Sequence, residues 1–335
     1  MNHQSNIRIV TYNILSSHLA PTSLYTACKP EDLDQSVRLI KVKEKLTAEI
    51  AQSSIICLQE ISILWAGQLH TFFANNGYYL ITGLYGPKKT GYMGVGIAIP
   101  IKKYEICDVD ISCIADTKQL PQKSEQSISL FNSFLNKVKT MIINIAVYLK
   151  LYERPMNVNE LWETALGRPN QMVCTRLMDL ASSKEFVLGT YHLPCIFELP
   201  AVMVIQAALS AQHIHRYAKG LPYVYVGDFN IKPYDLAYRL ITEGSISSTE
   251  ENYPLSLPND SWTPHLERPL RSAYRARLGR EPDFTNYVKV RDDPIFMETL
   301  DYLFYSSDSG HKCVISSFSR QNDDERLFFF WSPSK

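Results

Sequence analysis

Apolar runs that alternate with amphipathic stretches predict a series of short strands separated by helices. The first two strands are expected over Ile7–Tyr12 and Ser54–Gln59, with a helix over Asp34–Gln52 between them. Within that helix the apolar positions are Val37, Ile40, Leu46 and Ile50. A strand, a helix and a second strand, with polar residues at both strand ends, is the α/β pattern. In open α/β sheets, site residues tend to lie just past the carboxyl ends of the strands.

The pattern continues in the same manner along most of the chain. Further helices are expected over Ile61–Asn76, Pro200–Lys219 and Tyr234–Glu243. Further strands are expected over Tyr78–Thr82, Val95–Pro100, Met172–Leu177, Phe186–Tyr191, Tyr223–Val226, Glu298–Ser306 and Cys313–Phe318. Residues 116–128 read as a polar loop and residues 150–168 as irregular with some helix. For Phe131–Leu149 the pattern leaves helix and strand open, and the tail after Phe328 is given no element.

One stretch carries the strongest chemical signal. The strand Tyr223–Val226 is broken by Gly227, and Asp228 and Asn230 follow two positions apart, so their side chains can point the same way. Asp228 can accept a proton or hold a metal ion. The amide of Asn230 can donate a hydrogen bond to an oxyanion. A carboxylate and a carboxamide on a rigid strand end therefore suit a charged substrate.

Four other polar residues stand at or within predicted strands, namely Asn13, Glu60, His192 and Asp301. Singly, the first three have ordinary explanations: a turn asparagine, an exposed glutamate and a structural histidine. Asp301 is less ordinary, because a carboxylate inside an apolar strand is costly unless it is paired or bound to a metal. Together these residues supply the parts for metal-assisted phosphoryl chemistry, with Glu60 as an oxygen ligand for Mg²⁺.

The composition narrows the class of protein. Of 335 residues, 45% are hydrophobic, and 34 basic residues balance 34 acidic ones, so a generally sticky nucleic-acid binder is not expected. The seven cysteines form no Cys-x-x-Cys pair, which argues against a zinc or disulfide framework and favours an intracellular setting, cytoplasmic or nuclear. We expect no signal peptide, membrane span or membrane partner.

The motifs together resemble the endonuclease/exonuclease/phosphatase superfamily, the DNase-I-like Mg²⁺ phosphodiesterases. The resemblance rests on Thr11–Leu15, Leu58–Ile61, Thr190–Leu193, Gly227–Asn230 and Leu300–Tyr302, which occur in the family's order. It implies an α/β fold of two packed β-sheets flanked by helices, a four-layer α/β/β/α sandwich forming one domain over residues 1–335. It also implies that Glu60 holds Mg²⁺, with Mn²⁺ as the alternative, that Asp228 and Asn230 handle the water and the oxyanion, and that Asn13 and His192 bind phosphate.

A closer resemblance is to carbon-catabolite-repressor-type deadenylases, nocturnin and 2′-phosphodiesterases. It rests on Leu270–Tyr274, Glu281–Tyr287 and Asp301–Ser306. In that group an aromatic residue five positions before the aspartate stacks on the base, and Phe296 stands there. The alternative for Phe296 is a core aromatic residue. The candidate substrate-binding residues are Phe296, Pro200 and Arg271, the last within an arginine cluster that could equally be a solvated loop.

The chain departs from the family at its end. The family closes with Ser-Asp-His, whose histidine pairs with the aspartate matching Asp301, whereas this chain ends Trp331–Lys335, and His311 lies too near that strand. Asp301 is therefore expected to lack its imidazole, and the family's last strand to be missing.

The main hypothesis is a Mg²⁺-dependent phosphodiesterase, a 3′–5′ exoribonuclease of the deadenylase type acting on RNA or a nucleotide. One alternative is a pseudo-enzyme that binds nucleic acid or nucleotide. Another is a phosphatase or 2′-phosphodiesterase acting on a small nucleotide or a phospholipid. Since no leucine-rich region precedes the domain, docking to a larger deadenylase complex is not expected.

Overall fold

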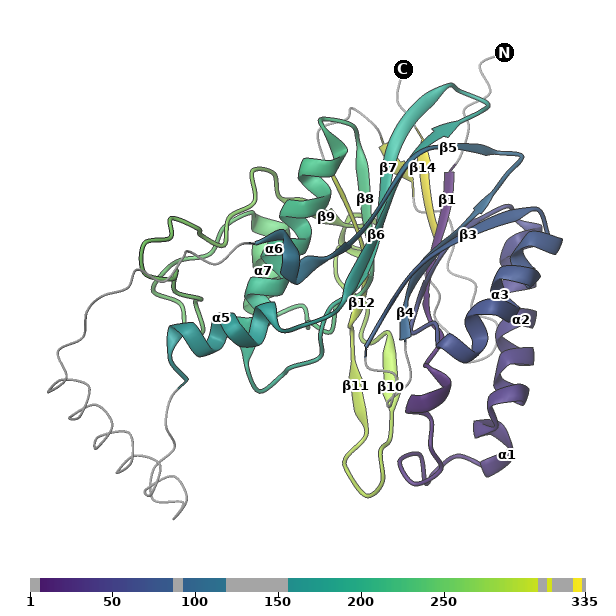
Figure 1. The fold of residues 1–335 in the computed structure, drawn as a ribbon, viewed down its shortest axis with the longest axis horizontal. Helices are drawn as coiled ribbons and strands as arrows, with labels where there is room; N and C mark the ends of the chain where they lie inside the picture. The colour runs from purple at the N-terminus through teal and green to yellow at the C-terminus, as the bar shows by residue number, and fades with distance from the viewer. Residues whose placement is uncertain (1–6, 87–92, 119–155, 307–311, 315–327, 333–335) are drawn as a thin grey trace, which may run out of the picture.

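A computed structural model describes residues 7–86, 93–118, 156–306, 312–314 and 328–332 (Figure 1). The stretch Phe131–Leu149, for which helix and strand stayed open, and most of the predicted loop 116–128 lie outside these residues. His311 lies outside them as well.

Two six-stranded sheets form the centre of the fold. The first has the order β13 (Lys312–Val314), β14 (Phe328–Ser332), β1 (Ile7–Asn13), β2 (Ile55–Gln59), β4 (Met93–Pro100) and β3 (Tyr78–Tyr85). The second has the order β5 (Tyr104–Cys113), β6 (Gln171–Asp179), β7 (Lys184–His192), β8 (Tyr223–Asp228), β12 (Asp301–Ser306) and β9 (Leu270–Ser272). A separate two-stranded ribbon pairs β10 (Asn286–Val288) with β11 (Phe296–Glu298).

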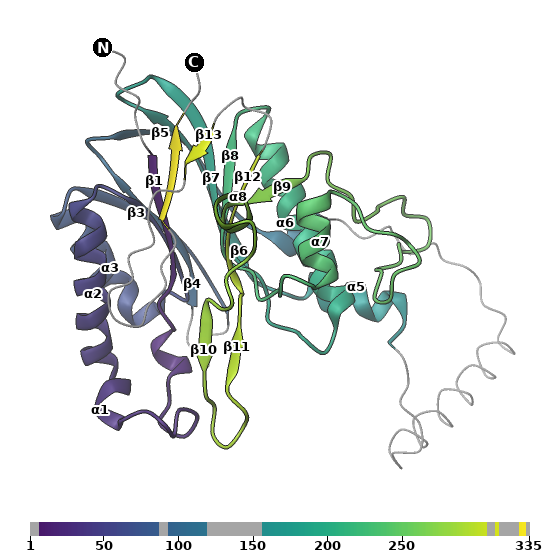
Figure 2. The same ribbon diagram turned by 180° about the vertical axis from the view of Figure 1, so that it is seen from behind.

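Helices cover the outer face of each sheet (Figures 1 and 2). The first sheet carries α1 (Pro30–Leu33), α2 (Gln35–Ala51) and α3 (Ile63–Asn75) on its side of the molecule. The second carries α5 (Val158–Leu166), α6 (Pro200–Ala218) and α7 (Leu236–Glu243). Shorter helices are η1 (Ser17–Leu19), η2 (Ile114–Thr117) and α8 (Ala273–Leu278). The expected four-layer α/β/β/α sandwich is confirmed. No helix among the described residues is long and apolar enough to cross a membrane.

Strand β8 shows why the sheets pack on both faces. Val224 and Val226 belong to the apolar layer between the two sheets, whereas Tyr223 and Tyr225 belong to the layer under α6. Side chains on a strand alternate between faces, so this one run of apolar residues fills two cores. Burial of all six residues of β8 holds the strand rigidly and fixes the position of its end, where Asp228 stands.

Most predicted elements are present with shifted ends, and α5 is the helix expected within residues 150–168. Two differences are informative. The tail, for which no element was predicted, forms β14, which pairs antiparallel with β1. No strand was expected over Tyr104–Cys113, yet these residues form β5. In the part of the chain that the structure describes, β5 lies at the edge of its sheet, pairs with β6 and has a bulge between Ile106 and Asp108. Edge strands commonly carry charged residues, and the acidic residues of β5 interrupt the alternation of apolar and polar positions that would have predicted a strand.

Candidate active site

Polar residues from both sheets meet at one edge of the sandwich. The parallel pairing of β1 with β2 sets Asn13 beside Gln59, next to Glu60, and the parallel pairing of β7 with β8 sets His192 beside Asp228. The antiparallel pairing of β8 with β12 then places Asp301 directly opposite Asp228. Because strands β1 and β8 pack against each other across the two sheets, the ends of all five strands share one site.

The amide of Asn13 joins a carboxylate of each sheet. Its Nδ2 donates to Oε1 of Glu60 at 2.8 Å and to Oδ2 of Asp228 at 2.9 Å. Its Oδ1 accepts a hydrogen bond from the backbone nitrogen of Leu15 at 2.9 Å. Both amide hydrogens are therefore used to position the two carboxylates, and the residue fixes the spacing between the sheets at this point.

Glu60 is held on a constrained backbone just past β2. Its φ is 61°, in the left-handed region that few glutamates adopt. The Oε2 of Glu60 accepts a hydrogen bond from the backbone nitrogen of Ser16 at 2.9 Å. The preceding residue, Gln59, donates from Nε2 to the hydroxyl of Thr190 on the other sheet at 3.0 Å. The carboxylate thus stands in a fixed orientation, with lone pairs left on both oxygens.

Arg38 of α2 secures the loop that carries Ser16. Its guanidinium donates to the carbonyl oxygens of Ile14 and Leu15 and stacks on the Trp65 ring, 5.1 Å from the ring centroid. A cation over an indole face is stabilising. The loop after β1 is therefore anchored from a helix, and with it the backbone donor to Glu60.

Asp228 and Asn230 form a local hydrogen-bonded turn at the end of β8. The backbone nitrogen of Asn230 donates to Oδ1 of Asp228 at 3.0 Å, and the φ of Asn230 is 51°. The Nδ2 of Asn230 donates to the carbonyl oxygen of Leu193 at 2.9 Å. A primary amide carries two hydrogens, so the second remains for a substrate oxygen.

His192 lies beside Asp228 but is oriented by two residues from elsewhere. Its Nε2 is 4.0 Å from Oδ2 of Asp228, and its Nδ1 is 3.4 Å from the hydroxyl of Tyr85. Asn170 donates from Nδ2 to the backbone carbonyl of His192 at 2.8 Å and to the Tyr85 hydroxyl at 3.3 Å. The imidazole is buried and its ring plane is set by this small network.

Asp301 is paired with a hydroxyl group. The Oγ1 of Thr285 donates to Oδ2 of Asp301 at 2.8 Å and accepts from the backbone nitrogens of Leu300 and Asp301 at 3.0 Å each. Burial raises the pKa of Asp301 well above its usual range, and the nearby charges of Asp228 and Glu60 raise it further. This carboxyl group therefore holds a proton more readily than an exposed aspartate does.

The three acidic groups crowd one another. Burial raises the pKa of Asp228, and the charge of Glu60 adds to that effect, although His192 and Asn13 oppose it. A site of buried, oxygen-bearing groups with excess negative charge suits a hard divalent cation. Mg²⁺ is commonly held by one or two carboxylates while it keeps several waters, so Glu60 with its fixed orientation fits the role of protein ligand.

Aromatic rings and a lysine lie next to this edge. The rings of Phe197 and Phe296 are 6.2 Å apart between centroids, and Nζ of Lys232 is 5.8 Å from the first and 5.7 Å from the second. Lys232 follows Asn230 by two residues, so the group adjoins the end of β8. Its Nζ also lies 3.5 Å from Oε1 of Glu298, beside Phe296 on the ribbon.

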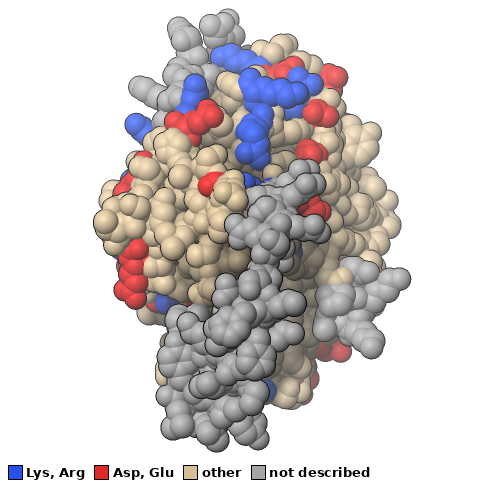
Figure 3. Space-filling model, turned by 60° about the vertical axis from the view of Figure 1, so that its left-hand side comes forward, with Lys and Arg blue, Asp and Glu red and all other residues tan. Residues whose placement is uncertain are grey.

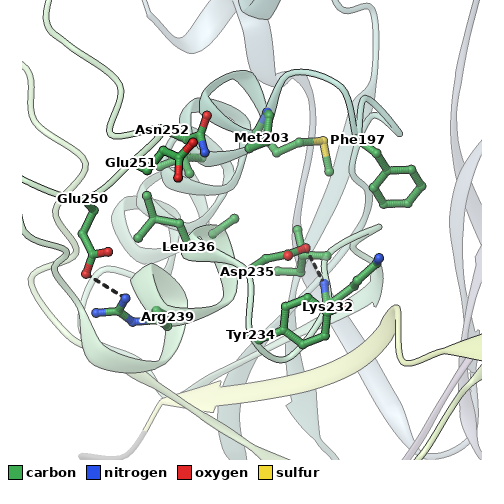
Figure 4. A pocket seen from close by; sticks show the side chains of 14 residues that line it. Phe197, Met203, Lys232, Tyr234, Asp235, Leu236, Arg239, Glu250, Glu251 and Asn252 are labelled. Carbon is green, nitrogen blue, oxygen red and sulfur yellow. Dashed lines mark hydrogen bonds and ion pairs between the residues drawn. The ribbon is translucent and has the colours of Figure 1, made fainter.

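A pocket of about 360 Å³ opens beside this group, between the start of α6 and α7. Figure 4 shows Phe197 and Lys232 at one side of it, and Arg239 with Glu250 at the other. Pro200, at the first turn of α6, is part of the lining. Of the three candidate substrate-binding residues, two thus lie together: Pro200 in the pocket and Phe296 at the neighbouring aromatic pair.

Arg271 is placed elsewhere. It lies exposed on the edge strand β9 opposite Tyr305, four residues along β12 from Asp301, which is roughly 13 Å at the usual rise of a strand. The structure therefore does not bring Arg271 to the group of acidic residues. Figure 3 shows one face of the molecule, on which basic side chains gather at one end with acidic ones among them.

The profile of the Endonuclease/Exonuclease/phosphatase family matches residues 10–319, nearly the whole described fold. The chain belongs to the endonuclease/exonuclease/phosphatase family. The convergence of Asn13, Glu60, His192, Asp228 and Asp301 thus occurs in a member of this family, and the resemblance seen in the motifs is confirmed.

Two curated relatives within this family are similar to the chain over most of its length. The chain is 25% identical over 315 residues to 2′,5′-phosphodiesterase 12 of Mus musculus, covering 91% of this chain and 45% of that protein. It is also 25% identical over 349 residues to the CCR4-Not complex 3′-5′-exoribonuclease subunit Ccr4 of Aspergillus fumigatus, covering 92% and 46% respectively. The chain therefore spans about half the length of the curated relatives it matches.

Solved structures agree on the fold. The crystal structure of ANGEL2, a 2′,3′-cyclic phosphatase, has a TM-score of 0.68 at 17% identity, covering 99% of this chain and 96% of that one. The human Nocturnin catalytic domain has a TM-score of 0.59 at 16% identity, with 100% and 95% covered. At such low identity these structures establish the architecture of this family member and nothing finer.

Several residues that shape the site were not singled out from the sequence. Tyr85 and Asn170 set the His192 ring, Thr285 holds Asp301, and Phe197 with Lys232 flanks Phe296. A single tyrosine at a strand end or an asparagine before a strand has no distinctive local pattern. Of these residues, Thr285 could have been noticed, because it lies within the segment Glu281–Tyr287 that carries the family resemblance.

Proposed function

We propose that this family member is a Mg²⁺-dependent phosphodiesterase, and specifically a 3′–5′ exoribonuclease of the deadenylase type. The observation that supports it best is the link from Glu60 through Asn13 to Asp228, with His192 and Asp301 on either side of Asp228. Asn230 adds an amide hydrogen at the same edge. Such an arrangement offers a metal ligand, a base and hydrogen-bond donors around one phosphoryl group.

The chain's own residues have separate tasks in this proposal. Glu60 would hold the metal ion, whose chemistry is to neutralise charge on the phosphoryl oxygens. Asp228 orients a water molecule and accepts its proton, which its raised pKa favours. Asn230 and His192 donate to the phosphate oxygens, and Asn13 keeps the two carboxylates at a fixed separation. Asp301 stays close to Asp228, whose charge raises the pKa of Asp301.

The aromatic pair supports a nucleobase as the group next to the scissile phosphate. Phe197 and Phe296 present rings from two different segments of the chain, and Nζ of Lys232 lies within 5.8 Å of both ring centroids. Base stacking on aromatic side chains is worth roughly 1–3 kcal/mol per base and tolerates any sequence. The Ccr4 relative is named as a 3′-5′-exoribonuclease, which agrees with an RNA end as substrate.

A second candidate is a 2′-phosphodiesterase that acts on a small nucleotide. It is favoured by the match to 2′,5′-phosphodiesterase 12, at 25% identity over 315 residues. The two candidates share the metal, the base and the stacking rings. They differ only in which ribose oxygen leaves the phosphorus atom.

Matched substrates separate the candidates. The wild-type protein is incubated with 3′,5′-linked oligoadenylate, 2′,5′-linked oligoadenylate, a 2′,3′-cyclic nucleotide and an inositol phospholipid, each with Mg²⁺ or with a chelator. We expect Mg²⁺-dependent shortening of the 3′,5′-linked chain from its 3′ end. Preference for the 2′,5′-linked chain would favour the second candidate, and turnover of the phospholipid alone would refute both.

A pair of glutamate variants tests the site itself. Glu60→Gln removes a ligand charge and is expected to lower the rate at least 10²-fold, as loss of one charge-stabilising group commonly does. Glu163→Gln, on the exposed face of α5, is the matched control and should retain full activity. Equal activity of Glu60→Gln and wild type would contradict the proposal, as would tight substrate binding without turnover by the wild-type chain.

A further inference from the structure

A cysteine, a histidine and an aspartate come together away from the acidic edge. Asp110 of β5 and Cys174 of β6 are direct partners in the antiparallel register of these two strands. His213 reaches them from α6, with its Nε2 2.7 Å from Oδ2 of Asp110. One ligand atom from each of the three residues lies within 4.8 Å of the other two. Three separate elements therefore meet at a single point.

Two hydroxyl-bearing residues, Ser112 and Tyr217, lie around the three side chains. The hydroxyl of Ser112 donates to both carboxylate oxygens of Asp110, at 3.0 and 2.9 Å. Tyr217 follows His213 by one turn of α6 and so projects from the same side of the helix. Its hydroxyl is buried and lies next to the carboxylate of Asp108. Burial raises the pKa of Tyr217, and the charges of Asp108, Cys174 and Asp110 act in the same direction.

A simple ion pair explains only part of this arrangement. A hydrogen bond between His213 and Asp110 would attach α6 to the edge strand β5, and Cys174 would then be an ordinary core residue. That reading gives no role to the thiol placed against the pair. A metal ion bound by all three residues would give the thiol a role.

The spacing is compatible with a tetrahedral ion. Zinc bonds of about 2.0–2.3 Å to nitrogen, oxygen and sulfur place neighbouring ligand atoms roughly 3.3–3.8 Å apart. The contact of His213 with Asp110 is shorter than this, at 2.7 Å, and the limit for the whole group is 4.8 Å. Side-chain movements of about 1 Å or less would bring the three atoms to the distances that zinc needs.

We propose that Asp110, Cys174 and His213 form a Zn²⁺ site, with the fourth position taken by water beside the Tyr217 hydroxyl. A thiolate with an imidazole and a carboxylate is a ligand set that Zn²⁺ accepts and Mg²⁺ does not. On binding, the thiol of Cys174 forms a bond from sulfur to zinc and releases its proton to the solvent. His213 lies 13 residues along α6 from Pro200, which is roughly 20 Å along the helix axis. The site is therefore separate from the proposed phosphodiester site and does not rest on it.

The role of this zinc would be to tie β5 to the rest of its sheet. Among the described residues, strand β5 is an edge strand that pairs with β6 and contains a bulge. A ligand bond from β5, one from β6 and one from α6 would fix this edge against the helix layer. We expect bound Zn²⁺ to raise the melting temperature of the full chain.

Cobalt provides the direct test, because a thiolate bound to Co²⁺ gives a charge-transfer band in the near ultraviolet. The reduced, chelator-treated chain is titrated with Co²⁺ in excess Mg²⁺, which occupies hard oxygen sites. We expect one equivalent of Co²⁺ to produce the band and Zn²⁺ to abolish it by displacement. Cys174→Ser and His213→Gln should each remove the band. His215→Gln is the matched control, since His215 lies on the same helix and pairs with Glu267 at 3.1 Å.

One further variant controls for an unrelated thiol. Cys195→Ser removes an exposed thiol near the acidic edge, where the charges of Asp228 and Glu60 act on it. Because Cys195 is not one of the three proposed ligands, the band should persist in this variant. If Cys174→Ser fails to fold, His213→Gln, whose side chain is partly exposed, still decides the matter. Absence of the band in the wild type, or its survival in His213→Gln at unchanged affinity, would overturn the zinc site.

Discussion

Asp301 and Asp228 are direct cross-strand partners at the same edge of the sandwich, where Asp228 is buried and Asp301 is partly buried. Like charges directly opposite each other on neighbouring strands are destabilising. The fold holds them together through Asn13 on one side and Thr285 on the other. This relationship links the stability of the metal-free protein to its function, and it leads to the first prediction.

Without a metal ion, Asp301→Asn should stabilise the protein at neutral pH. The pKa of Asp301 is raised in the folded state above its ordinary value of 3.8. Above pH 3.8 the unfolded chain loses a proton that the folded chain keeps, so stability falls as pH rises through the window up to the folded pKa. Each unit of elevation corresponds to about 1.4 kcal/mol.

The measurement is the melting temperature in chelator, from about pH 4 to about pH 8. The wild type should lose stability across this range, and Asp301→Asn should lose less. Saturating Mg²⁺ should reduce the difference between the two proteins at neutral pH. Parallel curves for both proteins in chelator would contradict a proton held at this pair.

Asn13→Ala should raise the Mg²⁺ concentration needed for half-maximal activity by about 10–100-fold. The substitution removes the donor that orients Glu60 and Asp228, and loss of such an orienting partner typically weakens metal binding by that factor. Asn76→Ala is the control, because the side chain of Asn76 donates to the carbonyl oxygen of Phe72 at the end of α3. An unchanged Mg²⁺ requirement would show that Asn13 does not position the ligands.

Gly227→Ala should destabilise the fold by about 2–5 kcal/mol, because overpacking adds to backbone strain. A Cβ at Gly227 would lie 1.9 Å from the backbone oxygen of Tyr191, and the φ of Gly227 is 150°. Gly220→Ala is the comparison, with a φ of 87° and nothing within 4 Å of the added carbon. It should cost only about 1–2 kcal/mol. Urea unfolding measures both, and equal losses would mean that the close approach of β7 and β8 can relax.

Phe197→Ala and Phe296→Ala should each weaken substrate binding by about 1–3 kcal/mol, or roughly 5- to 150-fold, if a base stacks on the pair. The change should appear mainly in KM. Tyr79→Ala on β3, whose ring is 56% exposed, is the control for loss of a surface aromatic residue. Unchanged KM values for both phenylalanine variants would mean that the ring pair is only a packing contact.

Arg271→Ala tests whether the arginine cluster contacts RNA phosphates. A phosphate contact should appear as a decrease of about 0.7 in the log–log salt dependence of single-stranded RNA binding. Arg176→Ala is the control, since Arg176 lies on β6 and pairs with Glu185. An unchanged slope would agree with the position of Arg271 on β9, away from the acidic edge.

Local patterns were enough to predict most of the elements. The helix over Asp34–Gln52 appears as α2 with Asp34 as its N-cap, and Pro200 begins α6 as expected. Strand β5 escaped prediction because acidic residues on an edge strand conceal its period. The tail strand β14 owes its existence to pairing with β1, which lies more than 300 residues earlier in the chain. No local pattern can indicate such a partner.

The sequence by itself determined the strand-end positions of Asn13, Glu60, His192, Asp228 and Asn230, because Gly227 and the β-branched runs fix where the strands stop. It also determined the family, through motifs in a fixed order. Only the tertiary structure decided that Asn13 donates both amide hydrogens to carboxylates, and that Asp301 faces Asp228. It alone also brought Asp110, Cys174 and His213 to one point. Register and sheet packing set these contacts, and both depend on burying apolar surface between residues far apart in the chain, which no local pattern encodes.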